Sequence, residues 1–473
     1  MCNRFATLKR SIIWLCCLLM AAASVRPPAL ALTIGEERDI GEKLLYMIRT
    51  EFSLLDDPDI SQYINGLGQQ VLAQAGPQYF DYHFFVVPSK EFNAFAAPSG
   101  LIFFFTGLIE TMKTEDELLS VMAHEIGHVV SRHIASRLDK SAKVGAISMA
   151  MAMASLALGD PSLAAGLFTG FQAAGQAAYL HFSRIDEEEA DRLAYDWLHA
   201  LRRDPKAMEG MLRSMCRIAR YRSEQIPPYL LTHPNPEARL DYVQSLLDYQ
   251  ANKVPRNYYT ETDNFDFLRM KYRTMVAVFD PQKTRAYLIR TLAGRDSVET
   301  AMAAYGLALL EAKELNFAKA LEHLATVKKQ YPERLIIDVD TGIVHLDSGD
   351  TTRALELLEQ AAGRNPHDMY AAFHLARACE KTGQVERAEK LFQQVMKFMP
   401  EYSQIYFELG RIKANQGQQA ISNYYLAKYY LYEGKVELAT EYFTKIKKNA
   451  TVSEAMREEA EMILQRLEEL KKL

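Results

Sequence analysis

The sequence is poor in cysteine, and none of its cysteines is placed to build a disulfide framework. Of 5 cysteines in 473 residues, Cys2, Cys16 and Cys17 crowd the N-terminus, which leaves Cys216 and Cys379 far apart. We expect two unpaired thiols, although one bridge between them is chemically allowed in an oxidising compartment. The chain also lacks a basic excess, since 55 basic residues face 60 acidic ones. Nucleic acid is therefore not an expected partner.

The N-terminus lacks an apolar run long enough to cross a membrane. The run from Ser11 to Ala23 has 13 residues, against the roughly 20 that a spanning helix needs. Basic residues precede this run and Ala29-Leu30-Ala31 follows it. This pattern is typical of a cleaved signal peptide over residues 1–31 rather than a retained anchor. The remaining 51 basic and 60 acidic residues would give an exported chain with a net charge of −9.

What the chain does have is an ordinary globular composition, with 49% hydrophobic and 24% charged residues. Its length predicts two or three domains. The pattern after Leu32 is mainly helical, with two β-rich stretches at Tyr82–Val87 and Leu101–Thr106. Thr114 and Glu117 have the spacing of a capping box that opens a helix. We therefore expect a small sheet among helices.

The C-terminal third repeats every 34 residues. Three residue types share this period, namely Ala320, Ala354 and Ala388, Pro332, Pro366 and Pro400, and Gly349, Gly383 and Gly417. This is the length of a tetratricopeptide repeat, a pair of helices that turns at Gly, packs closely at Ala and ends at Pro. A further partial unit runs from Leu426 to Phe443. Stacked helix pairs leave a concave face, which is the usual docking surface for a protein partner.

The sharpest motif is His124-Glu125-Ile126-Gly127-His128. On a helix the two histidines lie one turn apart on one face, so both imidazoles can reach one metal ion. Glu125 lies about 100° around the helix from His124, where it can accept a proton from the attacking water. Neutral imidazoles suit zinc.

A catalytic zinc also needs a third protein ligand. The metzincin arrangement is excluded because Ser131 and Ile134 stand where Gly and His are needed, and His133 has the wrong helical spacing. An acidic cluster downstream, Asp186 to Asp191, places Glu187 and Asp191 on one helix face. One of the two can bind the metal while the other orients a histidine. The alternative is a solvated acidic face.

Together these motifs resemble the zinc metallopeptidase family of the CAAX prenyl endopeptidase and HtpX. The resemblance covers nearly the whole chain after residue 31 and is greatest to its periplasmic branch of β-barrel assembly-enhancing proteases with a tetratricopeptide tail. Its motifs here are Asn93-Ala94-Phe95-Ala96, His124 to His128, Ser183 to Asp191, and His233-Pro234 with Arg239. The resemblance implies His124, His128 and Glu187 as zinc ligands, Glu125 as general base, and Asp191 and Arg239 as supporting residues.

His233 is flanked by Pro234 and, two residues further, Pro236, so we expect it on a stiff loop. The resemblance implies either a removable fourth zinc ligand or a stabiliser of the developing oxyanion, and an ordinary surface histidine is the alternative. We favour a gate that substrate displaces. The stretch Asn93 to Ala96 is expected to offer a strand edge to an unfolded substrate.

The segment Val144–Leu180 holds two apolar stretches that are too short to cross a membrane. Interior packing is one interpretation, and a Met-rich lid that binds unfolded substrate or contacts a membrane surface peripherally is the other.

The expected fold is mainly α. An α+β zincin domain of the gluzincin type with a small β-sheet spans residues 32–250, connecting helices span 251–296, and an all-α tetratricopeptide repeat solenoid spans 297–473. The expected function is that of a periplasmic zinc metalloendopeptidase with one Zn²⁺ per chain. Its partners by resemblance are misassembled or unfolded proteins, outer-membrane β-barrel precursors and their assembly machinery, which it would assist as well as degrade. The alternatives are a non-proteolytic repeat scaffold or holdase with a structural zinc, and a zinc amidase acting on lipid or glycan.

Overall fold

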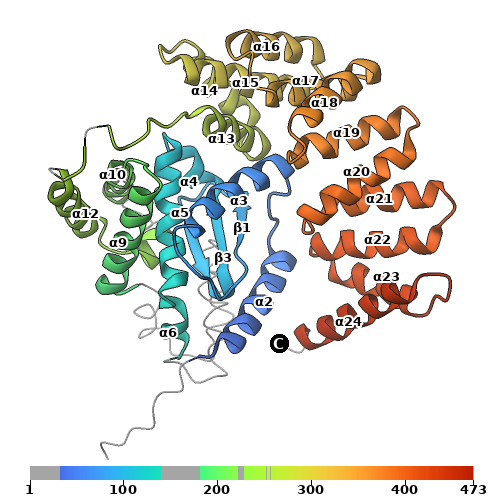
Figure 1. The fold of residues 1–473 in the computed structure, drawn as a ribbon, viewed down its shortest axis with the longest axis horizontal. Helices are drawn as coiled ribbons and strands as arrows, with labels where there is room; N and C mark the ends of the chain where they lie inside the picture. Colours follow the sequence, from blue (N-terminus) through green and yellow to red (C-terminus); the bar gives the residue numbers. More distant parts are fainter. Residues whose placement is uncertain (1–31, 140–181, 222–227, 252, 256, 472–473) are drawn as a thin grey trace, which may run out of the picture.

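The computed structural model describes residues 32–139, 182–221, 228–251, 253–255 and 257–471 (Figure 1). The expected signal peptide and the segment Val144–Leu180 lie outside these residues, so their interpretations stay predictions.

A three-stranded sheet lies at the centre of the N-terminal half. The strands β1 (His83–Val87), β2 (Ala94–Ala97) and β3 (Leu101–Phe105) have the order β1-β3-β2, with β1 parallel and β2 antiparallel to β3. Every residue of β3 is buried, because side chains of a central strand alternate between two covered faces. Ile102 and Phe104 join the main core with α3 (Pro58–Leu72), while Leu101, Phe103 and Phe105 face α2 (Ile34–Glu51).

The predicted strands are thus present with shorter bounds. Tyr82 precedes β1, and Thr106 is the first residue of the helix α4 (Thr106–Thr111) rather than the last of a strand. Between β2 and β3 the chain turns through Ser99 and Gly100, which both have positive φ.

The helix that carries the His-Glu motif is α5 (Glu115–Val130), and its capping differs from the prediction. The Thr114 hydroxyl accepts a hydrogen bond from the Glu117 amide as expected, but the Glu117 carboxylate accepts from the amide of Lys113 and not from that of Thr114. The capping box is therefore only half formed.

Helix α5 packs most closely on α9 (Arg184–Ala200). A Cβ atom at Gly127 would lie 3.2 Å from the Ala190 Cα, so the glycine of the motif lets the two helices approach. The described part of this half also contains α6 (His133–Asp139), α10 (Lys206–Tyr221), α11 (Pro228–Thr232) and α12 (Pro236–Ala251).

The C-terminal half is a stack of antiparallel helix pairs (Figure 1). Its helices are α15 (Ser297–Lys313), α16 (Phe317–Gln330), α17 (Ile336–Ser348), α18 (Thr351–Arg364), α19 (Met369–Lys381), α20 (Val385–Phe398), α21 (Ser403–Asn415), α22 (Gln419–Tyr432), α23 (Val436–Lys447) and α24 (Glu454–Leu470). The periodic alanines are fully buried on the second helix of each pair. Gly349, Gly383 and Gly417 turn the chain with positive φ, and Gly434 does the same in the predicted terminal unit. The repeat prediction is confirmed in this arrangement.

Two connecting helices, α13 (Phe265–Val278) and α14 (Pro281–Leu292), join the halves. Arg269 on α13 is buried and pairs at 2.8 Å with Asp59 on α3 and at 2.9 Å with Asp340 on α17. At the far end of the stack, Arg466 on α24 returns to α2, where it pairs with Asp39 at 2.9 Å. The repeats therefore curve around the N-terminal half and contact it at both ends (Figure 1).

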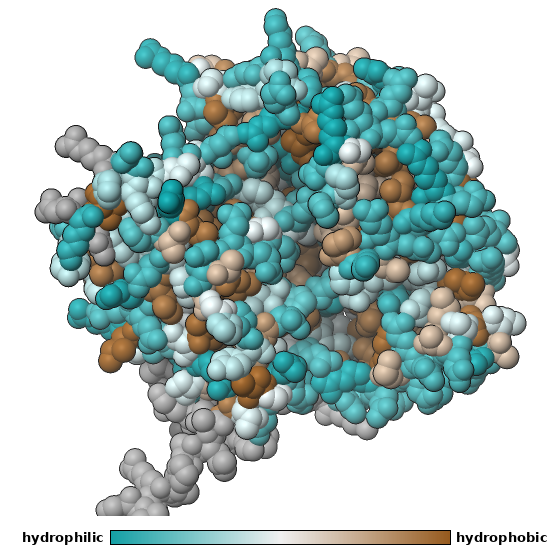
Figure 2. Space-filling model, in the orientation of Figure 1, coloured by the Kyte–Doolittle hydropathy of each residue, from teal (hydrophilic) through white to brown (hydrophobic). Residues whose placement is uncertain are grey.

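The face seen in Figure 2 is hollowed between the two halves, and apolar side chains contribute to the wall of the hollow. A cavity of about 660 Å³ lies between the halves, bounded by the end of α2, the start of β1 and the loop before α21.

Cys216 and Cys379 are both unpaired and buried, so the expected free thiols are confirmed. Among the described residues, no helix combines the length and the apolar character that a membrane span requires.

Candidate metal centre

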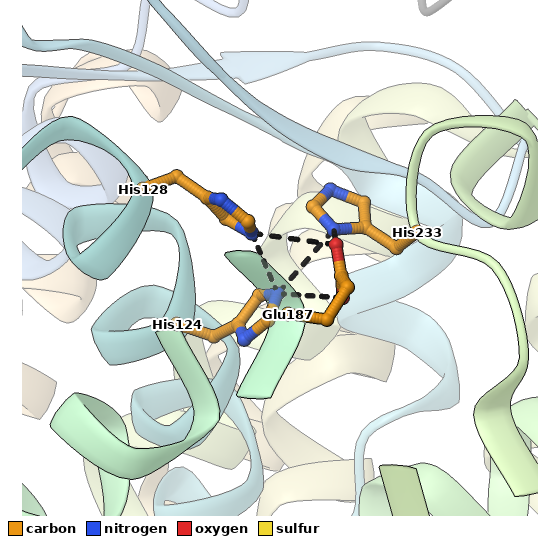
Figure 3. A group of neighbouring side chains, drawn as sticks. All are labelled: His124, His128, Glu187 and His233. Carbon is orange, nitrogen blue, oxygen red and sulfur yellow. Dashed lines mark hydrogen bonds and ion pairs between the residues drawn. The ribbon is translucent and has the colours of Figure 1, made fainter. Parts of the chain in front are cut away.

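Four side chains from three segments converge beneath the sheet (Figure 3). His124 and His128 come from α5, Glu187 from the first turns of α9, and His233 from the loop between α11 and α12. All four are buried, with at most 2% of each residue exposed. His233 lies outside any helix, as the neighbouring prolines predicted.

The spacing of the donor atoms fits one tetrahedral ion. The Nε2 atoms of His124 and His128 are 3.1 Å apart, and His124 Nε2 lies 3.3 Å from His233 Nδ1. Glu187 Oε1 lies 2.9 Å from His233 Nδ1 and 3.6 Å from His128 Nε2. Four ligands at zinc distances stand about 3.3 Å from one another. Three imidazole nitrogens and a carboxylate oxygen are also the donor types that zinc prefers.

Two members of the cluster have the protonation that a cation requires. Burial and the neighbouring His124 hold the pKa of His128 well below its ordinary value, so its ring is neutral. Burial alone would raise the pKa of Glu187, but His233 and Arg239 outweigh it and hold that pKa well below the usual range. Neutral imidazole and ionised carboxylate are the forms that bind metal. His124 differs, because burial and Arg239 would lower its pKa, but Asp191 and Glu187 outweigh them and raise that pKa from 6.5 to about 9. His124 must therefore lose a proton when a metal binds.

Glu125 lies beside the cluster without belonging to it. Its Oε1 atom is 3.5 Å from His233 Nε2 and accepts a hydrogen bond of 3.2 Å from the Tyr229 hydroxyl. Its Oε2 atom is buried and has no hydrogen-bond partner among the described residues. A buried carboxylate oxygen that makes no hydrogen bond to a described residue, beside four converging polar side chains, can accept a proton from a reacting molecule.

Asp191 and Arg239 contact two members of the cluster. The Asp191 Oδ1 atom lies 2.9 Å from His124 Nδ1, one turn along α9 from Glu187. Arg239, on α12, donates two hydrogen bonds to Asp191 and lies 2.9 Å from Glu187 Oε2. Burial raises the pKa of Asp191, but Arg239 and His124 outweigh it and lower that pKa. An ionised Asp191 fixes His124 with its Nδ1 protonated and its Nε2 toward the cluster.

The two glutamates that follow Glu187 point away from the cluster. Glu188 turns to Arg184 at 2.7 Å and Glu189 accepts a hydrogen bond from Ser131, so only Glu187 reaches the cluster. His133, which has the wrong spacing for a ligand, lies behind His128, with the two Nδ1 atoms 3.0 Å apart. Spacing alone did not predict this contact, because the chain leaves the α5 helix before His133.

The predicted substrate edge lies next to α5. Asn93, Ala94 and Phe95 are buried and Ala96 is half-buried, so the stretch offers mainly backbone. One side of β2 pairs with β3, and no other strand among the described residues pairs with its second side.

Comparison with known families and proteins agrees with this geometry. Residues 58–247 match peptidase family M48, and residues 345–409 match a tetratricopeptide repeat. The chain is 28% identical to the β-barrel assembly-enhancing protease of Yersinia pestis over 391 residues, which cover 82% of this chain and 79% of that protein. It is 35% identical to the protein of the same name from Escherichia coli over 211 residues, 44% of this chain and 43% of that one. It is 27% identical to the mitochondrial metalloendopeptidase OMA1 of Schizosaccharomyces pombe over 201 residues, 42% of this chain and 57% of that one.

Proposed function

We propose that this chain, a metalloendopeptidase of the M48 family with tetratricopeptide repeats, uses zinc to cleave misassembled outer-membrane β-barrel proteins in the periplasm. The observation that carries the proposal is the convergence of His124, His128 and Glu187 beside Glu125. The names of the relatives supply the client class, and the predicted signal peptide over residues 1–31 supports the compartment.

We assign His124, His128 and Glu187 as zinc ligands because their donor atoms are spaced as one ion requires. When bound, zinc would polarise the scissile carbonyl and make the attacking water more acidic. Asp191 and Arg239 would hold His124 and Glu187 in their binding orientations.

Glu125 would accept the proton of the attacking water and pass it to the leaving amine. Its free Oε2 atom is the acceptor, while Tyr229 fixes Oε1. The second side of β2 would hold the substrate backbone in extended form by adding a strand to the sheet. Such binding needs an unfolded chain, which favours misassembled clients over folded proteins.

His233 would close this site as a removable ligand. Its Nδ1 atom is 2.9 Å from Glu187 Oε1 and 3.3 Å from His124 Nε2, which is the fourth corner of the donor set. A substrate carbonyl and water need that corner, so His233 must move before the reaction. The other role, support of the oxyanion, would need His233 to remain in place.

The repeat half would choose the partners. We propose that residues 32–250 form the peptidase domain, residues 251–296 connect, and residues 297–473 dock β-barrel precursors and their assembly machinery. The hollow between the halves supports this division because a client held there is close to the peptidase domain. Assistance of assembly as well as degradation is the expected outcome of such docking.

The test compares the wild type with Glu125→Gln in casein digestion, with zinc content measured in both. We expect wild-type digestion that a chelator stops and zinc restores, and a Glu125→Gln form that holds zinc but cleaves nothing. Equal cleavage by both forms would overturn the role of Glu125. Zinc in both forms and cleavage in neither, with casein or with β-barrel precursors, would leave a docking scaffold with a structural metal.

A further inference from the structure

We infer that His133 is a positioning residue that fixes the proton of His128 on the far side of the metal site. The inference rests on the proposed function, since it assumes that His128 binds the metal. It concerns a residue that is not itself a ligand and that approaches the cluster from behind.

Both ring nitrogens of His128 lie close to a nitrogen of another histidine. Its Nε2 atom faces the cluster, 3.1 Å from His124 Nε2, and its Nδ1 atom faces His133 Nδ1 at 3.0 Å. To bind a metal through Nε2, His128 must offer the lone pair of that atom, so the proton of a neutral His128 lies on Nδ1. That proton can only be donated to His133 if the Nδ1 atom of His133 carries a lone pair.

The other nitrogen of His133 completes this assignment. With Nδ1 as acceptor, a neutral His133 carries its proton on Nε2, which faces Glu189 Oε2 at 3.4 Å and Asp186 Oδ1 at 3.9 Å. The Ser131 hydroxyl donates to the other oxygen of Glu189 at 2.8 Å. A relay from carboxylate to His133 to His128 results, and each member has its donor and acceptor in the matching place.

The backbone between His128 and His133 turns sharply, and this turn allows the two side chains to make contact. Arg132 has φ of 54°, a conformation that costs free energy in a residue with a side chain. Its guanidinium is held by the buried Glu37 at 2.8 Å and by the Leu32 carbonyl at 2.6 Å. This turn ends α5 and brings His133, the first residue of α6, back onto His128.

The two histidines of the relay are shielded from water, whereas its Glu189 end is exposed. His133 is buried, with 6% of the residue exposed. The Phe182 ring stacks on His128 with centroids 3.7 Å apart, and the Arg137 guanidinium lies 3.6 Å over the other side of Phe182. No described group other than His133 is bonded to the Nδ1 atom of His128.

The test measures binding of Zn²⁺ and Co²⁺ to purified full-length variants, with competition against a chelator. Loss of an orienting partner of a ligating histidine costs about 10–100-fold in metal affinity, and we expect this loss in His133→Ala. In His133→Asn the amide oxygen takes the place of the Nδ1 acceptor, so we expect most of the affinity and the visible spectrum of bound Co²⁺ to return. The thermal midpoint of each metal-free variant checks that it folds.

Two neighbouring acids give a matched control. Glu189→Gln weakens the far end of the relay, whereas Glu188→Gln alters a carboxylate that, among the described residues, pairs with Arg184 alone. We expect a several-fold loss of zinc affinity in the first and none in the second. Folded His133→Ala with wild-type affinity, or equal effects of Ala and Asn, would overturn the inference. A wild type that binds no zinc would instead overturn the proposed function.

Discussion

Tyr229 donates its hydroxyl to Oε1 of Glu125 at 3.2 Å. The same tyrosine stacks on His233 with ring centroids 4.4 Å apart. One side chain therefore holds both the proposed base and the proposed gate, and burial raises the pKa of Tyr229 well above its ordinary value, so its hydroxyl stays a donor. In the closed site His233 is therefore held by its contact with Tyr229 as well as by its contacts within the cluster.

Replacing the gate should open the site. His233→Ala removes the imidazole from the fourth corner, so basal cleavage of casein and self-cleavage should rise, as measured by fluorescence release and by gel. The Glu125→Gln change in the same background should abolish the gain. Activity equal to or below that of the wild type would reject the gate and leave the oxyanion role.

Tyr229→Phe should lower the rate of cleavage without opening the site. Phenylalanine keeps the stacking on His233 and loses the hydrogen bond that fixes Glu125, which is worth about 1.5 kcal/mol when the acceptor is charged. The rate should therefore fall by up to about tenfold in a peptide assay, with zinc content unchanged. A rise in rate would mean that the hydroxyl holds the site closed.

Asp191→Asn should weaken zinc binding about 10–100-fold, because the amide does not fix the His124 proton as the carboxylate does. Asp196→Asn is the matched control on the same helix, since Asp196 is exposed and pairs with Arg192 at 3.4 Å. Equilibrium dialysis against a chelator measures the difference. Equal affinities in the two variants would contradict the role of Asp191.

Much of this molecule could be predicted from local pattern. The helical spacing of His124 and His128, the shared face of Glu187 and Asp191, and the 34-residue period each depend on residues close in sequence, and the structure has all three. The two predicted β-rich stretches match β1 and β3 to within one residue at each end, whereas β2 was expected only as an extended edge. A periodic sequence pattern is enough to predict the relative positions of residues that lie in one helix or in one repeat.

The other features of the site and the fold depend on contacts between residues far apart in the sequence, which a periodic pattern does not predict. Helical spacing excludes His133 from the predicted site, but that spacing assumes an uninterrupted helix, and the turn at Arg132 ends α5 before His133. That turn is held by Glu37, which lies 95 residues earlier in the chain. The place of Tyr229 against Glu125 likewise depends on how α11 packs, and the curve of the repeats around α2 depends on pairs such as Arg466 with Asp39.

Another long-range contact joins the loop before α21 to α2 and β1. Glu401, in the loop before α21, pairs with Arg49 on α2 at 3.1 Å and with His83 on β1 at 3.6 Å. Partial burial raises the pKa of Glu401, but Arg49 and His83 outweigh it and lower the pKa from 4.5 to about 2. The bond to Glu401 in turn raises the pKa of His83 above 6.5.

The two shifts give the contact a defined pH window. The lowered pKa of Glu401 contributes stability that is complete above about 4.5 and lost as the pH falls toward about 2. The raised pKa of His83 contributes stability that is present below 6.5 and lost as the pH rises through its folded value. Glu401→Gln should therefore lower the thermal midpoint by about 2 °C, for a partly exposed contact of about 1 kcal/mol, most clearly between these limits. Glu386→Gln, on an exposed face of α20, should leave it unchanged. A deficit in Glu401→Gln that is the same at pH 3 as at pH 6 would show that charge does not join the halves here.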